Sequence, residues 1–199
     1  MLCRSRLAAL SCVLLASCLL AAVGRSDEPQ SKTRPAKWAV KLDRPGLPNL
    51  HKVNDRLYRG AQPTAEGIRE LEKLGVKTII CLREENDDKD ILGHAKIAVE
   101  HVPVKTWDPK DEQVDRFLQI VNDKKRQPVF VHCLHGADRT GTMCAVYRAA
   151  IDGWTKQQAI DEMIKGDFNF HSIWTNLPKF VENLDVEKIK DKAGLTKSR

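Results

Sequence analysis

From residue 53 onward, short apolar runs of strand length alternate with longer segments in which apolar residues recur every three or four positions. Short apolar runs bounded by turn residues are typical of buried strands, whereas the three-to-four spacing is typical of amphipathic helices. Strands that alternate with helices are joined by crossovers, which favours a parallel sheet covered by helices. The pattern therefore predicts an α/β fold: a three-layer sandwich with a central, mostly parallel sheet of four to five strands flanked by helices. Strands are expected over 53–59, 76–82, 99–104 and 129–131, and helices over 65–74, 87–98, 111–122, 140–151, 155–165 and 178–192.

The first 24 residues have the pattern of an export signal. Two arginines and no acid lie within residues 1–6, residues 7–24 carry no charge, and Ala22 and Gly24 are small residues at the positions that a signal peptidase reads. We expect a cleaved signal over 1–24 and an exported protein of the periplasm or cell envelope. Two alternatives stay open: Cys18 ends a segment that resembles a lipoprotein cleavage box, and an uncleaved stretch of this length could anchor the chain in a membrane. Either way, membrane contact is expected only through this signal or a lipid anchor.

The cysteines and charges narrow the class of protein further. Of six cysteines, three lie in the expected signal, which leaves Cys81, Cys133 and Cys144. An odd number in an exported protein argues against a disulfide scaffold and for a reactive thiol. The net charge of +6 comes from interleaved acids and bases without a block of like charges, so nucleic acid is not an expected partner. Residues 25–50 contain four prolines, which predicts a linker and extended N-terminal arm before a folded domain over 51–192 and a tail over 193–199.

The segment from His132 to Gly141 lies between an apolar strand and an apolar helix. A loop that leaves a parallel strand and enters a helix directs backbone N–H groups into one concavity, where the helix N-terminus adds partial positive charge. Such a cradle binds a tetrahedral dianion and stabilises the thiolate form of a cysteine within it, here Cys133. Arg139, six residues later, can bond two phosphate oxygens, and Gly136 permits the tight backbone curl. Nucleophile, anion cradle and guanidinium therefore lie within seven residues.

The residues from Cys133 to Arg139 resemble the Cys-x5-Arg signature of the cysteine-dependent protein tyrosine phosphatase superfamily, and the flanking His132, Thr140 and Gly141 extend the match. Residues 58–63, Tyr-Arg-Gly-Ala-Gln-Pro, resemble the corresponding segment of its compact dual-specificity branch. The resemblance covers roughly residues 50–175, and we identify a bacterial exported type. It implies a phosphatase domain over 51–192 that acts on phosphotyrosine, on other phosphoproteins or on small phosphate esters.

The same resemblance implies roles for the loop residues. The thiolate of Cys133 attacks phosphorus to form a phosphocysteine, while Arg139 and the backbone N–H groups of 134–139 hold the phosphate oxygens. The hydroxyl of Thr140 is expected to donate to Cys133 and ease departure of the thiolate. No metal and no cofactor is expected. The expected substrate-binding positions are Leu134, His135, Gly136 and Ala137.

The general acid is open among three aspartates. Asp108 lies in Val-Lys-Thr-Trp-Asp-Pro, 25 residues before Cys133, and resembles the acid-bearing loop of the family without matching it; an aspartate there can equally cap the next helix. Asp111 follows on the same loop. Asp138 lies inside the cradle, at a place where relatives that act on phosphoinositides carry an aspartate. Each could protonate the leaving oxygen from a loop or helix end near the cradle.

Two other functions and one cysteine pairing remain as alternatives. An inositol phosphate or phosphoinositide phosphatase is favoured by Asp138, but the lysines that lipid phosphatases often place in the cradle are absent. A catalytically inactive phosphate-binding module would not require Cys133. By the resemblance, Cys81 could form a protective disulfide with Cys133; a buried apolar cysteine is the competing interpretation.

Overall fold

The structure, a computed structural model, describes residues 34–85 and 88–195. The expected signal over 1–24 and the end of the tail, 196–199, lie outside these residues. The strands are β1 (Val40–Lys41), β2 (His51–Lys52), β3 (Leu57–Gly60), β4 (Thr78–Cys81), β5 (Ala98–His101) and β6 (Val129–His132). The helices are α1 (Ala65–Lys73), α2 (Asp88–Ile91), α3 (Asp111–Asn122), α4 (Asp138–Ala150), α5 (Lys156–Lys165), α6 (Asn176–Asn183) and α7 (Val186–Lys192).

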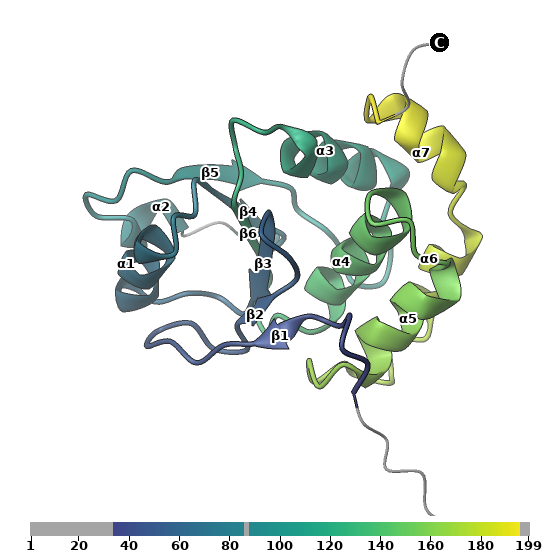
Figure 1. Ribbon diagram of the computed structural model, residues 1–199, viewed down its shortest axis with the longest axis horizontal. Helices are drawn as coiled ribbons and strands as arrows, with labels where there is room; N and C mark the ends of the chain where they lie inside the picture. The colour runs from purple at the N-terminus through teal and green to yellow at the C-terminus, as the bar shows by residue number, and fades with distance from the viewer. Residues whose placement is uncertain (1–33, 86–87, 196–199) are drawn as a thin grey trace, which may run out of the picture. The chain divides into compact units, whose positions relative to one another are not determined.

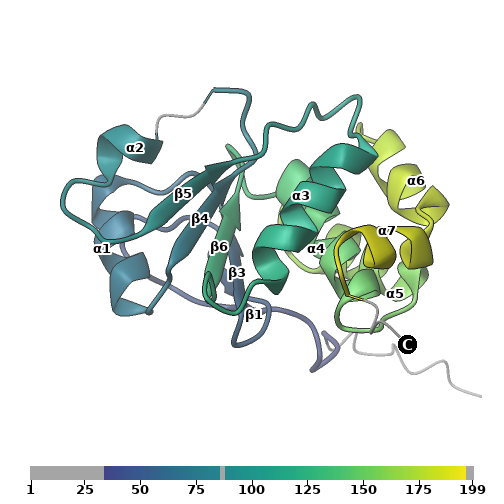
Figure 2. The same ribbon diagram turned by 90° about the horizontal axis from the view of Figure 1, so that it is seen from above.

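The six strands form one mixed sheet in the order β1-β2-β3-β6-β4-β5 (Figure 1). Strands β3, β6, β4 and β5 are parallel, whereas β1 and β2 pair antiparallel at one edge. Helices α1 and α2 cover one face, and α3 and α4 cover the other, with α5, α6 and α7 packed beyond them (Figure 2). The α/β class and the flanking helices are confirmed, and β6 lies in the middle of the parallel part.

Alternate residues of the central strands supply the two apolar cores. Phe130 and Ile79 pack with Ile68 and Leu71 of α1, while Val131 packs toward α3 and α4. Residues that point to opposite faces of a strand alternate, so a strand covered on both sides must be apolar throughout. This is why the strands have no polar alternation in the sequence, and it fixes the C-terminal end of β6 between the two helical layers.

Cap residues set the helix bounds that the sequence predicts correctly. Thr64 accepts a hydrogen bond from the backbone N–H of Gly67 at 3.2 Å and starts α1, and Gly75 follows its end with a φ of +77°. Helix α3 has the predicted bounds. The predicted inward face of α3 is buried throughout: Val114, Phe117, Leu118 and Val121.

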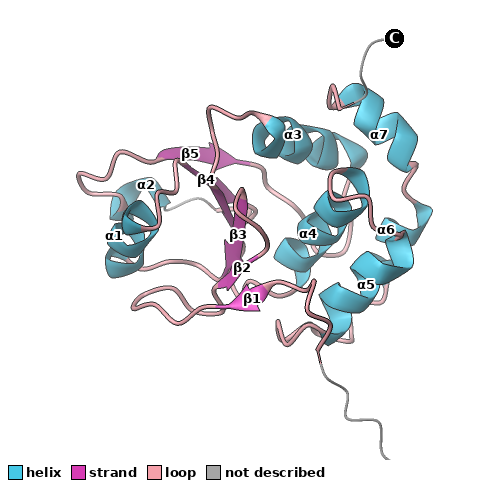
Figure 3. Ribbon diagram, viewed as in Figure 1, coloured by secondary structure: helices cyan, strands magenta, loops and turns pink. Residues whose placement is uncertain are grey.

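Several predicted elements differ from the structure. The sheet has six strands because the arm and the next segment add β1 and β2, each of two residues (Figure 3). The strand predicted over 53–59 is interrupted: the side chain of Asn54 accepts hydrogen bonds from the N–H groups of Arg56 and Leu57, which makes a turn before β3. The helix predicted over 87–98 is the short α2, which ends before Gly93 at a φ of +57°. The helix predicted over 178–192 is two helices, because Asp185 caps α7.

The N-terminal arm is tied to the helical layer by a buried polar network. The N–H of Ala39 donates to Glu162 Oε1 at 2.6 Å, and the same carboxylate binds the guanidinium of Arg148 at 2.8 Å. Both charged side chains are at least 95% buried, so each satisfies the other in the low-dielectric interior. The arm thereby connects to α4 and α5, the helices behind the cradle.

Candidate active site

The loop 133–137 joins the central strand β6 to α4 at the carboxyl end of the parallel strands. Ligands of open α/β sheets bind at this end. A cleft of about 290 Å³ opens there, and it brings together most of the predicted site residues. It is lined by Thr106, Cys133, Leu134, His135, Asp138, Arg139, His171, Ile173 and Trp174.

The backbone of the loop is arranged as an anion cradle. Cys133 lies at the base of this cradle and is 2% exposed. Helix α4 begins with Asp138, so its N-terminus faces the loop. The N–H groups of residues 134–137 donate to no acceptor within 34–85 and 88–195, although the carbonyls of Leu134 and Gly136 are bonded from outside the loop. Four consecutive uncommitted donors beside a helix N-terminus suit a phosphate dianion.

Gly136 is required by two features of the loop. Its φ is +69°, and a Cβ built on it would lie 2.3 Å from the carbonyl carbon of Gly60 and 2.5 Å from the N of Ala61. These contacts are with backbone, which cannot rotate away. The end of β3 and the cradle therefore touch at a point that admits only glycine.

Arg59 of β3 supports the loop of the cradle, a role that was not predicted from the sequence. Its guanidinium, 1% exposed, donates to the carbonyl of Gly136 at 2.7 Å and lies 3.6 Å from the ring centroid of Phe168. Burial lowers the pKa of Arg59, an effect that neighbouring acidic groups oppose. A charged residue within a strand of otherwise buried positions is the signal that could have found it.

His51 also contacts the ring of Phe168, and the burial of His51 makes the stability of the fold depend on pH. The rings of His51 and Phe168 meet edge to face at 4.7 Å, and burial, aided by the charge of Arg59, lowers the pKa of His51 from 6.5 to about 4. Between these values the unfolded chain binds a proton that the folded chain does not. The free energy of unfolding should therefore fall by about 3 kcal/mol as the pH drops from 6.5 to 4.

The variant His51→Asn isolates this contribution, since its amide can donate to the carbonyl of Asn49 as Nδ1 of His51 does. Denaturant unfolding at several pH values gives the free energy of unfolding as a function of pH. Between pH 6.5 and 5 this free energy should fall less steeply with falling pH in the variant than in the unmodified protein. Equal slopes would mean that His51 titrates alike in both states.

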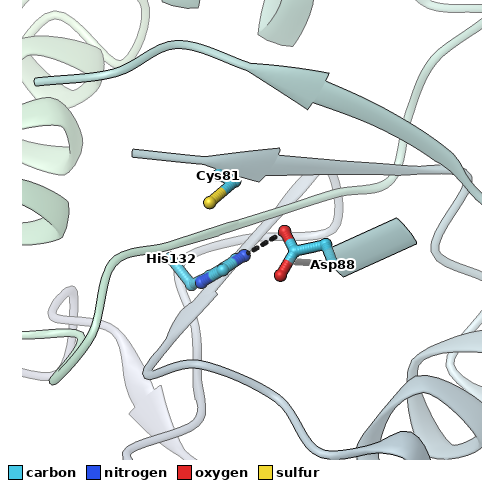
Figure 4. A group of neighbouring side chains, drawn as sticks. All are labelled: Cys81, Asp88 and His132. Atoms are coloured by element: carbon cyan, nitrogen blue, oxygen red, sulfur yellow. Dashed lines mark hydrogen bonds and ion pairs between the residues drawn. The ribbon is translucent and has the colours of Figure 1, made fainter. Parts of the chain in front are cut away.

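His132, the last residue of β6, is held by hydrogen bonds at both ring nitrogens. Nε2 lies 2.8 Å from Oδ2 of Asp88, and Nδ1 lies 3.2 Å from the carbonyl oxygen of Cys133. The side chain of Cys81 lies beside this pair (Figure 4). Asp88 is a buried carboxylate from α2 that sequence reasoning did not single out.

The three candidate acids occupy different environments. Asp138, 8% exposed, lines the cleft, and its carboxylate accepts hydrogen bonds from the N–H of His171 at 2.9 Å and from Nδ1 of His171 at 2.8 Å. Asp108 is half-exposed, pairs with Lys110 at 2.5 Å and is not a lining residue of the cleft. Asp111 lines a separate cavity of about 340 Å³ beside α6 and α7. His171 is a further cleft residue, brought there by the loop between α5 and α6.

Two predicted interactions of Cys133 are not formed in this structure. The hydroxyl of Thr140 is fully buried in the first turn of α4 and has no hydrogen-bond partner among the described residues, so the predicted bond to Cys133 is not made. Cys81, Cys133 and Cys144 are all free thiols and buried, so the disulfide is not present either. Burial raises the pKa of Cys81 to about 12 and that of Cys144 to about 11, which keeps both protonated.

Comparisons with known proteins agree with this geometry. Residues 36–177 match the family described as "DSP-PTPase phosphatase fused to NAD+ Kinase". The dual specificity protein phosphatase TpbA of Pseudomonas aeruginosa is 34% identical over 159 residues, which cover 79% of this chain and 72% of that protein. A crystal structure of P. aeruginosa TpbA, as a cysteine-to-serine variant in complex with phosphotyrosine, superposes with a TM-score of 0.73 at 31% identity over 82% of this chain and 100% of its own.

A more distant structure shares the fold. The catalytic core of the PP-IP phosphatase SIW14 from S. cerevisiae, in complex with citrate, superposes with a TM-score of 0.65 at 22% identity. The match covers 77% of this chain and 98% of that one.

Proposed function

The chain belongs to the DSP-PTPase family and is a cysteine-dependent phosphatase of the compact dual-specificity branch, and from this premise we propose that it hydrolyses phosphotyrosine or other phosphoprotein monoesters through a phosphocysteine intermediate. The observation that carries the proposal is the cleft. It combines a buried thiol, Cys133, with uncommitted N–H donors and the guanidinium of Arg139.

The rim of the cleft supports an aromatic phosphate ester as substrate. Ile173 is 79% exposed and Leu134 is 46% exposed, and both line the cleft together with Trp174. Exposed apolar side chains around a polar base favour a ligand with an apolar body and an anionic end. P. aeruginosa TpbA, the relative described above, was crystallised with phosphotyrosine.

The reaction proceeds in two steps. The thiolate of Cys133 attacks phosphorus, the bond to the leaving oxygen breaks, and that oxygen takes a proton from a general acid. Arg139 and the loop N–H groups hold the non-bridging oxygens while charge develops on them. Water then attacks the phosphocysteine, gives its proton to the ionised acid, and releases phosphate and the thiolate.

Asp138 is the proposed general acid. It lines the cleft with Cys133, whereas Asp108 would have to leave Lys110 and turn inward. We expect Asp138→Asn to lower kcat for an aryl phosphate with a poor leaving group by about 100-fold or more, and to remove the basic limb of the pH profile. For an aryl phosphate with a good leaving group, the variant should lose much less of its kcat, because the leaving oxygen departs without a proton.

Asp108→Asn is the matched control, and its pH profile should resemble that of the unmodified protein. Loss of the basic limb in Asp108→Asn alone would assign the acid to Asp108. Retention of the limb in both variants would exclude both residues.

The substrate class is tested by phosphate release from matched phosphotyrosine, phosphoserine, phosphothreonine, inositol phosphate and phosphoinositide substrates. The proposal predicts the highest kcat/KM for a phosphotyrosine peptide. A preference for inositol phosphates or phosphoinositides would contradict it and support the alternative that Asp138 suggests.

We also propose export, on the pattern of residues 1–24. In the part of the chain that the structure describes, no helix has the length and apolarity to cross a membrane. The test is N-terminal sequencing of the protein recovered from a cell-envelope fraction. We expect its first residue to be Arg25. A protein retained with Met1 in the cytoplasm would contradict export, and a lipidated Cys18 would support the anchored alternative.

A further inference from the structure

The side-chain amide of Asn49 donates hydrogen bonds to two loops of the active site. Nδ2 of Asn49 lies 3.0 Å from the carbonyl oxygen of His135, in the cradle, and 3.0 Å from the carbonyl oxygen of Phe168, in the loop between α5 and α6. An amide nitrogen carries two protons, so both are used. The two loops contribute His135 and His171 to the cleft. One side chain from a distant segment therefore joins two loops that line the cleft.

The bond to His135 affects the direction of an N–H group in the cradle. In a trans peptide unit, the C=O of one residue and the N–H of the next residue point in opposite directions. Asn49 lies outside the loop 133–137 and holds the carbonyl of His135 toward itself. The N–H of Gly136, which belongs to the same peptide unit, is therefore turned away from Asn49 and toward the inside of the cradle.

The neighbouring carbonyls of the cradle are held in the same way. The N–H of Gln62 donates to the carbonyl of Leu134 at 3.2 Å. Nη2 of Arg59 donates to the carbonyl of Gly136 at 2.7 Å. Together with the amide described above, three successive peptide units of the cradle are thus held by donors from one segment, residues 49–62. Each of these bonds directs the next N–H group inward, so the segment prepares the cradle for an anion before the anion binds.

The second loop that Asn49 holds has an uncommon backbone. Asp167 and Asn169 have φ values of +59° and +61°, in the left-handed region that residues other than glycine rarely adopt. Such a backbone persists where surrounding contacts fix it. The loop leads to His171, whose N–H and Nδ1 lie 2.9 and 2.8 Å from the carboxylate oxygens of Asp138. The placement of the proposed acid therefore depends on the loop that Asn49 holds.

The backbone of Asn49 offers a simpler explanation for an asparagine at this position. Its φ is +55°, and asparagine is one of the few residues that adopt such a value readily. A glycine would satisfy this requirement equally well. The backbone does not explain why both amide protons have acceptors in two other loops. The variant Asn49→Gly separates the two roles, because it keeps the backbone conformation accessible and removes only the amide.

We propose that Asn49 is a positioning residue that joins the cradle to the α5–α6 loop, so that the N–H of Gly136 faces the phosphate and His171 stays bonded to Asp138. The first consequence concerns binding of an anion and needs no catalysis. The second consequence, for proton transfer by Asp138, rests on the proposed function.

The first test measures phosphate binding. The dissociation constant of inorganic phosphate is obtained from a titration followed by phosphorus NMR, for the unmodified full chain and for Asn49→Gly. We expect binding to be about tenfold weaker in the variant, because one N–H donor is no longer held toward the anion. Asn183→Gly, the same substitution at an exposed position at the end of α6, should bind phosphate as the unmodified protein does. Equal dissociation constants for Asn49→Gly and the unmodified protein would overturn the proposal.

A third variant, Asn49→Ala, separates affinity from stability. Alanine also lacks the amide, and in addition it is strained at a positive φ, so Asn49→Ala should unfold at a lower denaturant concentration than Asn49→Gly. Because neither variant has the amide, we expect their dissociation constants for phosphate to be alike. Weakened binding in Asn49→Ala alone would show that the residue acts only through stability, and would overturn the proposal.

The second test measures proton transfer through the leaving group. A poor leaving group needs a proton from the acid, whereas a good one does not. In Asn49→Gly, kcat for an aryl phosphate with a poor leaving group should fall by about threefold more than kcat for one with a good leaving group, because His171 no longer holds Asp138 firmly. A loss of stability alone would lower both values equally, and equal losses would overturn the link from Asn49 to Asp138.

The two tests distinguish this proposal from the proposed function. Phosphate binding that weakens as expected in Asn49→Gly, in a protein that hydrolyses no phosphate ester, would refute the proposed function and leave the positioning of the cradle by Asn49 standing. Hydrolysis of phosphotyrosine with the same kinetic constants and phosphate affinity in Asn49→Gly and the unmodified protein would refute the role of Asn49 alone.

Discussion

Cys133→Ser is expected to lower the rate of phosphate release from an aryl phosphate by at least about 10,000-fold. The hydroxyl of serine is a far weaker acid than a thiol and stays protonated near neutral pH, whereas the cradle stabilises a thiolate. Binding of phosphate should survive, because the N–H groups of the loop and Arg139 do not depend on the sulfur. The measurement is kcat beside the dissociation constant of inorganic phosphate for the same preparation.

Cys144→Ser provides the matched control. This thiol is buried in α4, close to the cradle, and does not line the cleft. The Cys144→Ser variant should retain hydrolysis, and it should lose a modest amount of stability because a hydroxyl is placed in the apolar core. If Cys133→Ser hydrolyses as fast as Cys144→Ser, the enzyme does not use the nucleophile assigned here.

Gly136→Ala is expected to have the second largest effect, on both stability and activity. The added Cβ would lie 2.3 Å from the carbonyl carbon of Gly60, so the cradle or the end of β3 must move. We expect a loss of about 3 kcal/mol or more in the free energy of unfolding, because backbone clash adds to the strain of a positive φ. A displacement of about 1 Å in the cradle should also lower kcat/KM by about 100-fold.

Gly75→Ala separates strain from clash. Gly75 also has a positive φ, +77°, but a Cβ there would meet nothing within 4 Å. Chemical denaturation should show a loss of only about 1 kcal/mol, with hydrolysis unchanged. Equal losses in the two variants would show that the contact between Gly136 and Gly60 has no importance beyond the backbone conformation.

The parts of the fold that the sequence predicted depend on local signals. Thr64 and Gly75 mark the two ends of α1 because caps act within a few residues. The strand, loop and helix around Cys133 are also contiguous, so their chemistry could be inferred before the structure. By contrast, β1 and β2 have two residues each, which is too short for any periodicity to be visible.

The supporting residues of the site could not be predicted, since they come from distant segments. Asp88 reaches His132 across 44 residues, and His171 reaches Asp138 across 33. Arg59 binds the loop carbonyl of Gly136 across 77 residues. Such contacts depend on strand order and helix placement, which the spacing of residues along the chain does not determine. This also explains why the sequence left three aspartates open as the acid.

Trapping of the intermediate tests the central claim most directly. The enzyme is mixed with a slight excess of a phosphotyrosine peptide, quenched in acid within the first turnover, and digested for mass analysis. We expect one additional phosphoryl group on the peptide that contains Cys133, and we expect it to be absent from the Cys133→Ser variant. Phosphate released at full rate with no modified Cys133 peptide at any time, or a phosphoryl group on another residue, would contradict it.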